Sequence, residues 1–290
     1  MPSVLADFTG RFSVAGSERD GPVEGRILLG EEQLVLAASG DDRETIPLTG
    51  IFDVASGNEA ARIDPMPGTP VTIAYRNGST RTTAVVAAGE TTVEKFTTVL
   101  FKALLNGTPV TLRHPAKVGG RVLDTEFVGG LISLRSGGVV FETEKGPVLV
   151  PLSSIVDFNR ATRTVDGHDW PVVVVVHMDN GQALTTVVAT DSSRDLSLLG
   201  RYLRRTYDDV LESLQDLSLS EPETETLAAL YSTGDADVSL SSVVDADPKR
   251  VRRLLHALHE KGLVESGEHN PVLTATGQIV VNTYLERINE

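Results

Sequence analysis

The sequence contains no cysteine, so disulfide bonds, thiolate metal ligands and thiol catalysis are excluded. Lysine is also scarce, with six lysines beside 20 arginines. Long hydrophobic runs are absent, because the longest apolar stretch, residues 171–176, is far shorter than the roughly 20 residues that span a bilayer. The opening MPSVLADFTGRFS has no basic segment followed by an apolar run. We therefore expect a soluble, cytoplasmic protein without membrane insertion.

The charge balance is strongly acidic. Forty acidic residues against 26 basic ones give a formal net charge of −14. An acidic, lysine-poor chain rich in Thr and Val remains soluble when molar salt screens charges over about 3 Å. This composition predicts the cytosol of a halophilic archaeon. An ordinary acidic bacterial protein is the alternative, because charge governs solubility and not fold.

One stretch of the chain occurs twice. The segment that starts at Gly25 (GRILLGEEQLVLAASG) recurs from Gly130 (GLISLRSGGVVFETEKG). The matched positions are Ile27 with Ile132, Leu29 with Leu134, Leu36 with Phe141, Ile51 with Ile155, Asp53 with Asp157, and Asn77-Gly78 with Asn180-Gly181. Because the period is a domain's length, it predicts two copies of one globular fold. Two similar surfaces favour a binding scaffold over a one-pocket enzyme.

Each copy combines strands with one helix. Apolar residues alternate with a period of two, and Gly, Asn-Gly and Asp-rich turns separate the short strands. Helical spacing follows, from Thr91, with Glu94 placed for a capping box, to Asn106, and again after Ser192. This order predicts a small bent sheet or barrel closed by a helix, the plan of pleckstrin-homology-like (PH-like) domains. Residues 172–176 are apolar on both strand faces and are expected to be core.

The strand pattern ends near residue 217. Helical spacing then follows Ser220, recurs briefly around residues 243–244, and resumes in a third helix opened by Asp247-Pro248. Two short strands and a final helix complete a winged helix-turn-helix pattern. The sequence thus predicts an α+β protein with three domains. These are PH-like domain 1 at 1–106, PH-like domain 2 with its long helix at 107–216, and a winged helix-turn-helix domain at 217–290.

The third helix of the last domain carries a row of basic residues. Lys249, Arg250 and Arg253 match an acidic partner surface, and we expect Leu263 and Val264 of the wing to add apolar contact. The same row suits DNA phosphates, so a winged-helix transcriptional regulator with tandem sensor or dimerisation domains is the alternative function. Acidic residues around the helix make nucleic acid the less favoured partner. A homodimer through the long helix or the terminal helix stays open.

No residue pattern indicates catalysis. The nucleophile elbow, the glycine-rich phosphate loop and the HExxH motif are absent, and we expect no catalytic residue and no cofactor. His256 and His259 lie three residues apart on the third helix but lack a third ligand at a characteristic spacing. We interpret them as exposed histidines on a basic face, without a metal.

Four other polar or aromatic residues are given structural roles. Asp53 and Asp157 occupy equivalent positions in the two copies, which favours a turn or cap. His177 ends the valine-rich strand and is expected at its rim, and the single tryptophan, Trp170, is expected to anchor over the sheet. A lipid-binding role is disfavoured, because neither copy has the Lys/Arg cluster that phosphoinositide headgroups require.

The arrangement as a whole resembles a known family. Tandem copies with VPLSSIVDF-type strands, the long helix RDLSLLGRYLRRTYDDVLE and the terminal segment DPKRVRRLLHALHEKGLVE are similar to the archaeal taxis protein CheF family, over the whole chain. The resemblance implies a non-enzymatic chemotaxis adaptor, absent from bacteria, that couples the response regulator CheY to the archaellum switch complex. It implies CheY, the archaellum switch proteins and other chemotaxis proteins such as CheD as partners. The candidate site residues rest on charge and apolar patterns alone.

Overall fold

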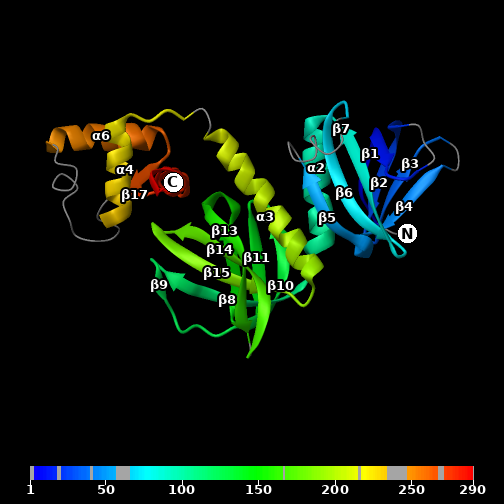
Figure 1. Cartoon of the computed structure of the whole chain (residues 1–290), viewed down its shortest axis with the longest axis horizontal. Helices are drawn as coiled ribbons and strands as arrows, with labels where there is room; N and C mark the ends of the chain where they lie inside the picture. Colours follow the sequence, from blue (N-terminus) through cyan, green and yellow to red (C-terminus); the bar gives the residue numbers. More distant parts are fainter. Residues whose placement is uncertain are drawn as a thin grey trace. The chain divides into compact units, whose positions relative to one another are not determined.

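The structure is a computed structural model that describes residues 3–17, 21–39, 42–56, 66–165, 167–214, 217–233, 247–266 and 271–289. It is an α+β protein with two large antiparallel sheets, a two-stranded hairpin and several helices (Figure 1). The chain forms two compact units. Unit 1 comprises Met1–Val110, Gly130–Arg135 and Thr190–Arg205, and unit 2 comprises Thr111–Gly129, Ser136–Ala189 and Thr206–Glu290. The division into three domains at residues 106 and 216 stays a prediction.

The first sheet has seven strands in the order β4-β3-β2-β1-β7-β6-β5. They are β1 (Val4–Val14), β2 (Val23–Gly30), β3 (Gln33–Ala37), β4 (Arg43–Pro47), β5 (Ile51–Ser56), β6 (Thr69–Asn77) and β7 (Thr80–Ala88), with the 3-10 helix η1 (Leu48–Gly50) before β5. Alternate residues point to one buried face, as in β2, where Ile27 and Leu29 are fully buried. This alternation is what the period-two spacing predicts.

The second sheet follows the same path, β12-β11-β10-β8-β15-β14-β13, with β9 paired to β8. Its strands are β8 (Pro109–Val118), β9 (Arg121–Val122), β10 (Val128–Arg135), β11 (Gly138–Thr143), β12 (Gly146–Pro151), β13 (Ile155–Val165), β14 (His168–Asp179) and β15 (Gln182–Ala189), with η2 (Leu152–Ser154) before β13. Because both sheets share one strand order, the internal repeat is confirmed. The predicted burial of the valine strand is also confirmed, since Val172 and Val173 are fully buried.

The strand register of the two copies agrees with their sequence alignment at one place and departs from it at another. A register shift occurs at the same place in each copy, between Ile51 and Asp53 and between Ile155 and Asp157. The hairpin turns, however, differ by one position. Asn77 pairs with Thr80, whereas the second turn is centred on Asn180-Gly181. Gly78, with φ 59°, is therefore the counterpart of Asn180, with φ 47°, and the Asn-Gly pairs do not superimpose.

Helix α2 (Glu90–Leu105) packs on β1, β6 and β7 of the first sheet (Figure 1). Its predicted apolar stripe is buried and includes Phe96 and Leu100. The predicted capping box is wrong: Gly89 is the N-cap, with no side-chain hydrogen bond, and Thr91 lies inside the first turn. The predicted end is confirmed, because Asn106 is the C-cap.

Helix α3 (Ser193–Ser213) begins in unit 1. The Arg194 guanidinium donates hydrogen bonds to the carbonyl oxygens of Leu48 (2.7 Å) and Ile51 (2.5 Å). About two turns further on, the Tyr202 ring lies 5.4 Å from the ring of Phe101, between centroids. The helix that follows the second sheet in sequence therefore completes the unit built around the first.

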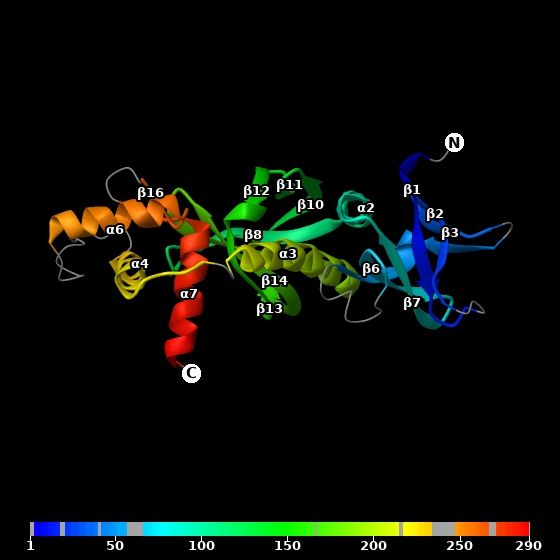
Figure 2. The same ribbon diagram turned by 90° about the horizontal axis from the view of Figure 1, so that it is seen from above.

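The C-terminal elements form one group (Figure 2). They share an apolar core. They are α4 (Glu221–Thr233), α6 (Pro248–Glu260), β16 (Val264–Ser266), β17 (Pro271–Leu273) and α7 (Ala275–Asn289). The short helix expected around residues 243–244 lies outside the described residues. Among the helices that are described, none is long and apolar enough to cross a membrane.

Candidate partner-binding surfaces

The basic helix α6 is amphipathic along its whole length. Asp247 caps it by accepting a hydrogen bond from the backbone N–H of Lys249 (3.3 Å), and Pro248 is its first residue, as the sequence predicts. Val251 and Leu258 are buried against the C-terminal core. The cations occupy the exposed face and are Lys249, Arg250, Arg252 and Arg253. None of these four forms an ion pair with another residue in the described part of the chain.

The two apolar residues predicted to join these cations lie elsewhere. Leu263 is 0% exposed and Val264 is 3% exposed, and both pack with Leu227, Leu258 and Leu273. Their part in partner binding stays a prediction. In this structure a partner reaches their side chains only if that core opens. Their observed role is to fix the hairpin β16–β17 against α6.

The two histidines of α6 are exposed, and each has a local contact. His256 Nδ1 lies 3.6 Å from the Glu260 carboxylate, one turn later. His259 Nδ1 lies 3.0 Å from the carbonyl oxygen of Val264, which accepts the hydrogen bond. Within the described ranges, no group of three potential ligands is placed to hold a metal ion.

The C-terminal end of α6 is joined to α4 by a contact that sequence reasoning missed. Glu223 accepts hydrogen bonds from the Ser220 N–H and hydroxyl (2.8 Å each), and from Lys261 Nζ (2.7 Å). These bonds, above all that from Lys261, lower the pKa of Glu223 from 4.5 to about 2. The sequence does contain a sign of the Ser220 contact, because Ser220 and Glu223 have the spacing of a capping box.

The paired aspartates have different partners. Asp53 accepts from the Val54 N–H (3.0 Å) and forms a two-point pair with Arg201 of α3 at 2.6 and 3.0 Å. Asp157 instead faces a cavity on the second sheet. Asp53 therefore has the expected structural role, whereas Asp157 lines a cavity.

His177 is not the rim residue that the sequence suggests. It is 2% exposed and stacks on His114, with 5.8 Å between ring centroids, while His114 Nδ1 is hydrogen-bonded to the Thr186 hydroxyl (2.8 Å). Burial, followed by the neighbouring His114, lowers the pKa of His177 to about 4. Sequence reasoning could not predict this pairing, because the two residues come from separate strands.

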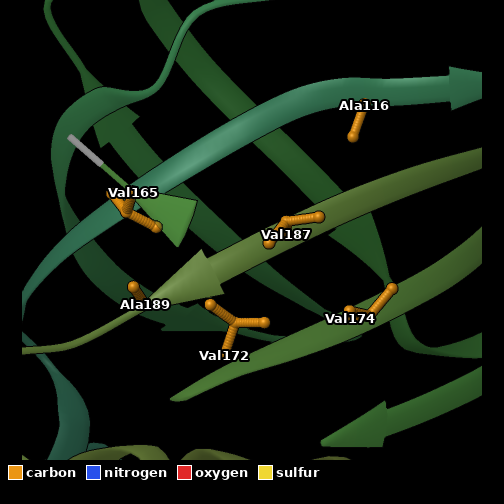
Figure 3. Close-up of a cluster of buried hydrophobic side chains, with 6 residues drawn as sticks. All are labelled: Ala116, Val165, Val172, Val174, Val187 and Ala189. Carbon is orange, nitrogen blue, oxygen red and sulfur yellow. The ribbon is translucent and has the colours of Figure 1, made fainter. Parts of the chain in front are cut away.

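The second sheet also has a second apolar face. Its cluster consists of Ala116, Val165, Val172, Val174, Val187 and Ala189 (Figure 3). Trp170 packs against this cluster, which confirms its expected anchoring role. A cavity of about 350 Å³ opens over part of the cluster, between β8, β13, β14 and β15.

Comparison with known proteins assigns this arrangement to archaeal signal transduction. A family model described as "Archaeal Chemotaxis signal transduction system protein F" matches residues 4–209. "Taxis protein CheF2" of Halobacterium salinarum is 37% identical over 287 residues, covering 99% of each chain. "Taxis protein CheF1" of the same organism is 29% identical over 90% of this chain and 89% of its own. The chain belongs to the CheF family of archaeal chemotaxis proteins.

The family assignment bears on the earlier expectations. It confirms the predicted resemblance and supports an archaeal, halophilic origin and a role in chemotaxis signalling, and it does not favour DNA binding. The family model ends before α4, but the match to the first relative extends over the C-terminal elements. A solved structure titled "Structure of the Spt16D Pob3N heterodimer" is 14% identical over 61% of this chain. Its TM-score of 0.27 is too low to support a conclusion about fold or function.

Proposed function

We propose that this protein is a non-enzymatic chemotaxis adaptor in the cytoplasm that links CheY to the archaellum switch complex. Membership of the CheF family supports a chemotaxis role. The observation that carries the link to CheY is the exposed row Lys249, Arg250 and Arg253 on α6, which has no ion-pair partner among the described residues. Such a row is notable in a chain whose net charge is −14.

The row fits an acidic partner surface. CheY-like receivers present acidic residues near their phosphorylation pocket, so α6 offers complementary charge. Preference for the phosphorylated form then needs only a difference in affinity between the two receiver states. Molar salt screens charge over about 3 Å, so only pairs in direct contact contribute. Two exposed aromatic side chains of the C-terminal group, Tyr231 and Tyr284, supply apolar surface for a partner.

The domain assignments belong to the same proposal. We infer that each large sheet with its following helix is a PH-like domain and that residues 217–290 form a winged helix-turn-helix domain used for protein contact. Shared strand order and the order of the described helices and hairpin support this. Two copies plus a third module give an adaptor separate surfaces for CheY, for the switch proteins and for other chemotaxis proteins such as CheD.

The test is binding of purified CheY to the full chain at molar KCl, with and without beryllium fluoride as the phosphoryl mimic. The variant Lys249→Glu/Arg250→Glu/Arg253→Glu is compared with Arg43→Glu/Arg76→Glu/Lys95→Glu, which reverses three exposed cations of unit 1. Three exposed ion pairs of about 0.2–1 kcal/mol each sum to roughly 0.6–3 kcal/mol, or about 3- to 150-fold in Kd. Equal loss in both variants, or none in the first, contradicts the proposed surface.

The alternative function has its own readout. A gel shift with genomic fragments reports sequence-specific DNA binding, and we expect none. Immobilised switch proteins should retain CheY only when the full chain is added. Specific retardation of DNA together with no binding of CheY contradicts the adaptor.

A further inference from the structure

The cavity on the second sheet has a defined floor and a defined wall. Its floor consists of Ala116, Val174, Val176 and Val187, from three neighbouring strands (Figure 3 shows all but Val176). Phe127 contributes one wall. Apolar floors of this kind provide most of the affinity in pockets for anchoring side chains or small ligands.

That wall is held in place by hydrogen bonds to β8. It belongs to the connection between β8 and β10, where the Leu123 N–H donates to the Ala116 carbonyl oxygen (3.0 Å). The Thr125 hydroxyl donates to the Pro115 carbonyl oxygen (2.8 Å), and the Arg113 guanidinium donates to the Leu123 carbonyl oxygen. The cavity is therefore bounded by fixed backbone.

The first copy closes the same face with its own side chain. Ala87 pairs with Arg11 of β1, and Ala189 pairs with Thr111 of β8. Because β1 and β8 occupy the same place in the two sheets, Ala87 and Ala189 are counterparts. Met66 packs on Val85 and Ala87 and is itself buried. In the second copy, the floor residue Val187 opens onto the cavity instead.

Positive charge surrounds the opening. Arg113, Lys117 and Arg163 line it, and among the described lining residues Asp157 alone is acidic. None of the three cations forms an ion pair with another described residue, and the Arg113 Nε is buried without a hydrogen-bond partner. The opening is thus cationic in a chain that is otherwise strongly acidic.

We propose that this cavity docks an acidic segment of a partner protein, with one apolar side chain on the valine floor and flanking carboxylates on Arg113, Lys117 and Arg163. A protein segment is favoured over a small molecule by Val122, which lines the cavity and is 64% exposed. A ligand contained in the cavity leaves that side chain in water, whereas a polypeptide crossing the rim covers it.

Trp170 provides the assay, because it is the only tryptophan, packs on the floor cluster and pairs across strands with Arg163. The full chain at molar KCl is titrated with the capped peptides DEFDE, DESDE and KKFKK, by tryptophan fluorescence and by calorimetry. We expect saturable binding of DEFDE with a Kd of about 0.1–1 mM, and at least about fivefold weaker binding of the other two.

Variants locate the site. Lys117→Gln/Arg163→Gln, which alters two exposed side chains, should weaken DEFDE binding about three- to tenfold, while Lys95→Gln on α2 changes it less than about twofold. Val176→Phe fills the cavity and should abolish binding, with folding checked by circular dichroism. Equal binding of the three peptides, binding unaffected by Lys117→Gln/Arg163→Gln, or no binding in either measurement overturns the proposal. The outcome is independent of the CheY test, in which the variant expected to lose binding alters only α6.

Discussion

Replacement of Glu223 by glutamine should loosen the junction between α4 and α6. Glu223 is 7% exposed, and its carboxylate accepts hydrogen bonds from Ser220 and from Lys261. Its pKa falls from 4.5 to about 2, so the charged form is favoured in the folded state by at most about 3 kcal/mol, at 1.36 kcal/mol per pKa unit. Glutamine keeps an acceptor for Ser220, and molar salt weakens the Lys261 pair. We therefore expect a loss of about 1–2 kcal/mol.

Hydrogen exchange measures this loss locally. Amides of α4 and α6 should exchange about 5- to 30-fold faster in Glu223→Gln, while amides of the first sheet provide the internal reference. Glu225→Gln is the matched control, because Glu225 is exposed on the same helix. Equal exchange in the two variants would refute the assigned role.

The pH dependence has a definite sign. Because the folded-state pKa of Glu223 is lowered, its stabilisation is fully present above about pH 4.5 and is lost as the pH falls toward about 2. The difference between wild type and Glu223→Gln should therefore shrink over that interval. A difference that stays constant down to pH 2 contradicts the reasoning.

Three further predictions concern other contacts. Leu258→Ala, at a fully buried position, should cost about 2–5 kcal/mol in the C-terminal core, read by exchange of α6 amides. A double-mutant cycle of Asp53→Asn and Arg201→Ala should give a coupling of about 1 kcal/mol by urea unfolding, because both side chains are about a third exposed, at 34% and 32%. The stability of unit 2 should fall by up to about 1.4 kcal/mol per pH unit between about pH 6.5 and 4, because the lowered pKa keeps His177 neutral when folded while the unfolded chain takes up a proton. His177→Phe should remove that contribution in urea melts followed by tryptophan fluorescence, and an unchanged slope contradicts it.

Periodic features were predictable because they depend on spacing that the sequence displays directly. Alternating apolar residues predicted the strands of both copies, and the equivalence of Asp53 and Asp157 is seen in the structure, where each follows a register shift. The basic face of α6 followed from helical spacing and from the start at Asp247-Pro248. These features need no knowledge of which elements meet.

Local motifs were less informative, because the same spacing occurs with and without its hydrogen bonds. Thr91 and Glu94 have the capping-box spacing, yet the helix begins before them at Gly89. Ser220 and Glu223 have the same spacing, and there the carboxylate does accept the Ser220 N–H. The surrounding chain, rather than the motif, decides which residue becomes the N-cap.

Burial within the C-terminal group required the three-dimensional arrangement. Leu263 and Val264 follow α6 closely in sequence, which suggested an exposed wing contact. The core contributed by Leu227 and Leu273 instead covers them. The cavity was likewise beyond sequence reasoning, since its lining comes from strands far apart along the chain.

The first part of α3 belongs to unit 1, and this constrains how the protein folds during its synthesis. Asp53 meets its arginine 148 residues later in the chain, and Phe101 meets Tyr202, which also follows the whole second sheet. A nascent first copy therefore leaves the ribosome lacking its last packing partners, and it gains them only after translation has passed residue 205. Expression of residues 1–106 alone reproduces that unfinished intermediate permanently, and aggregation of the fragment is its expected consequence.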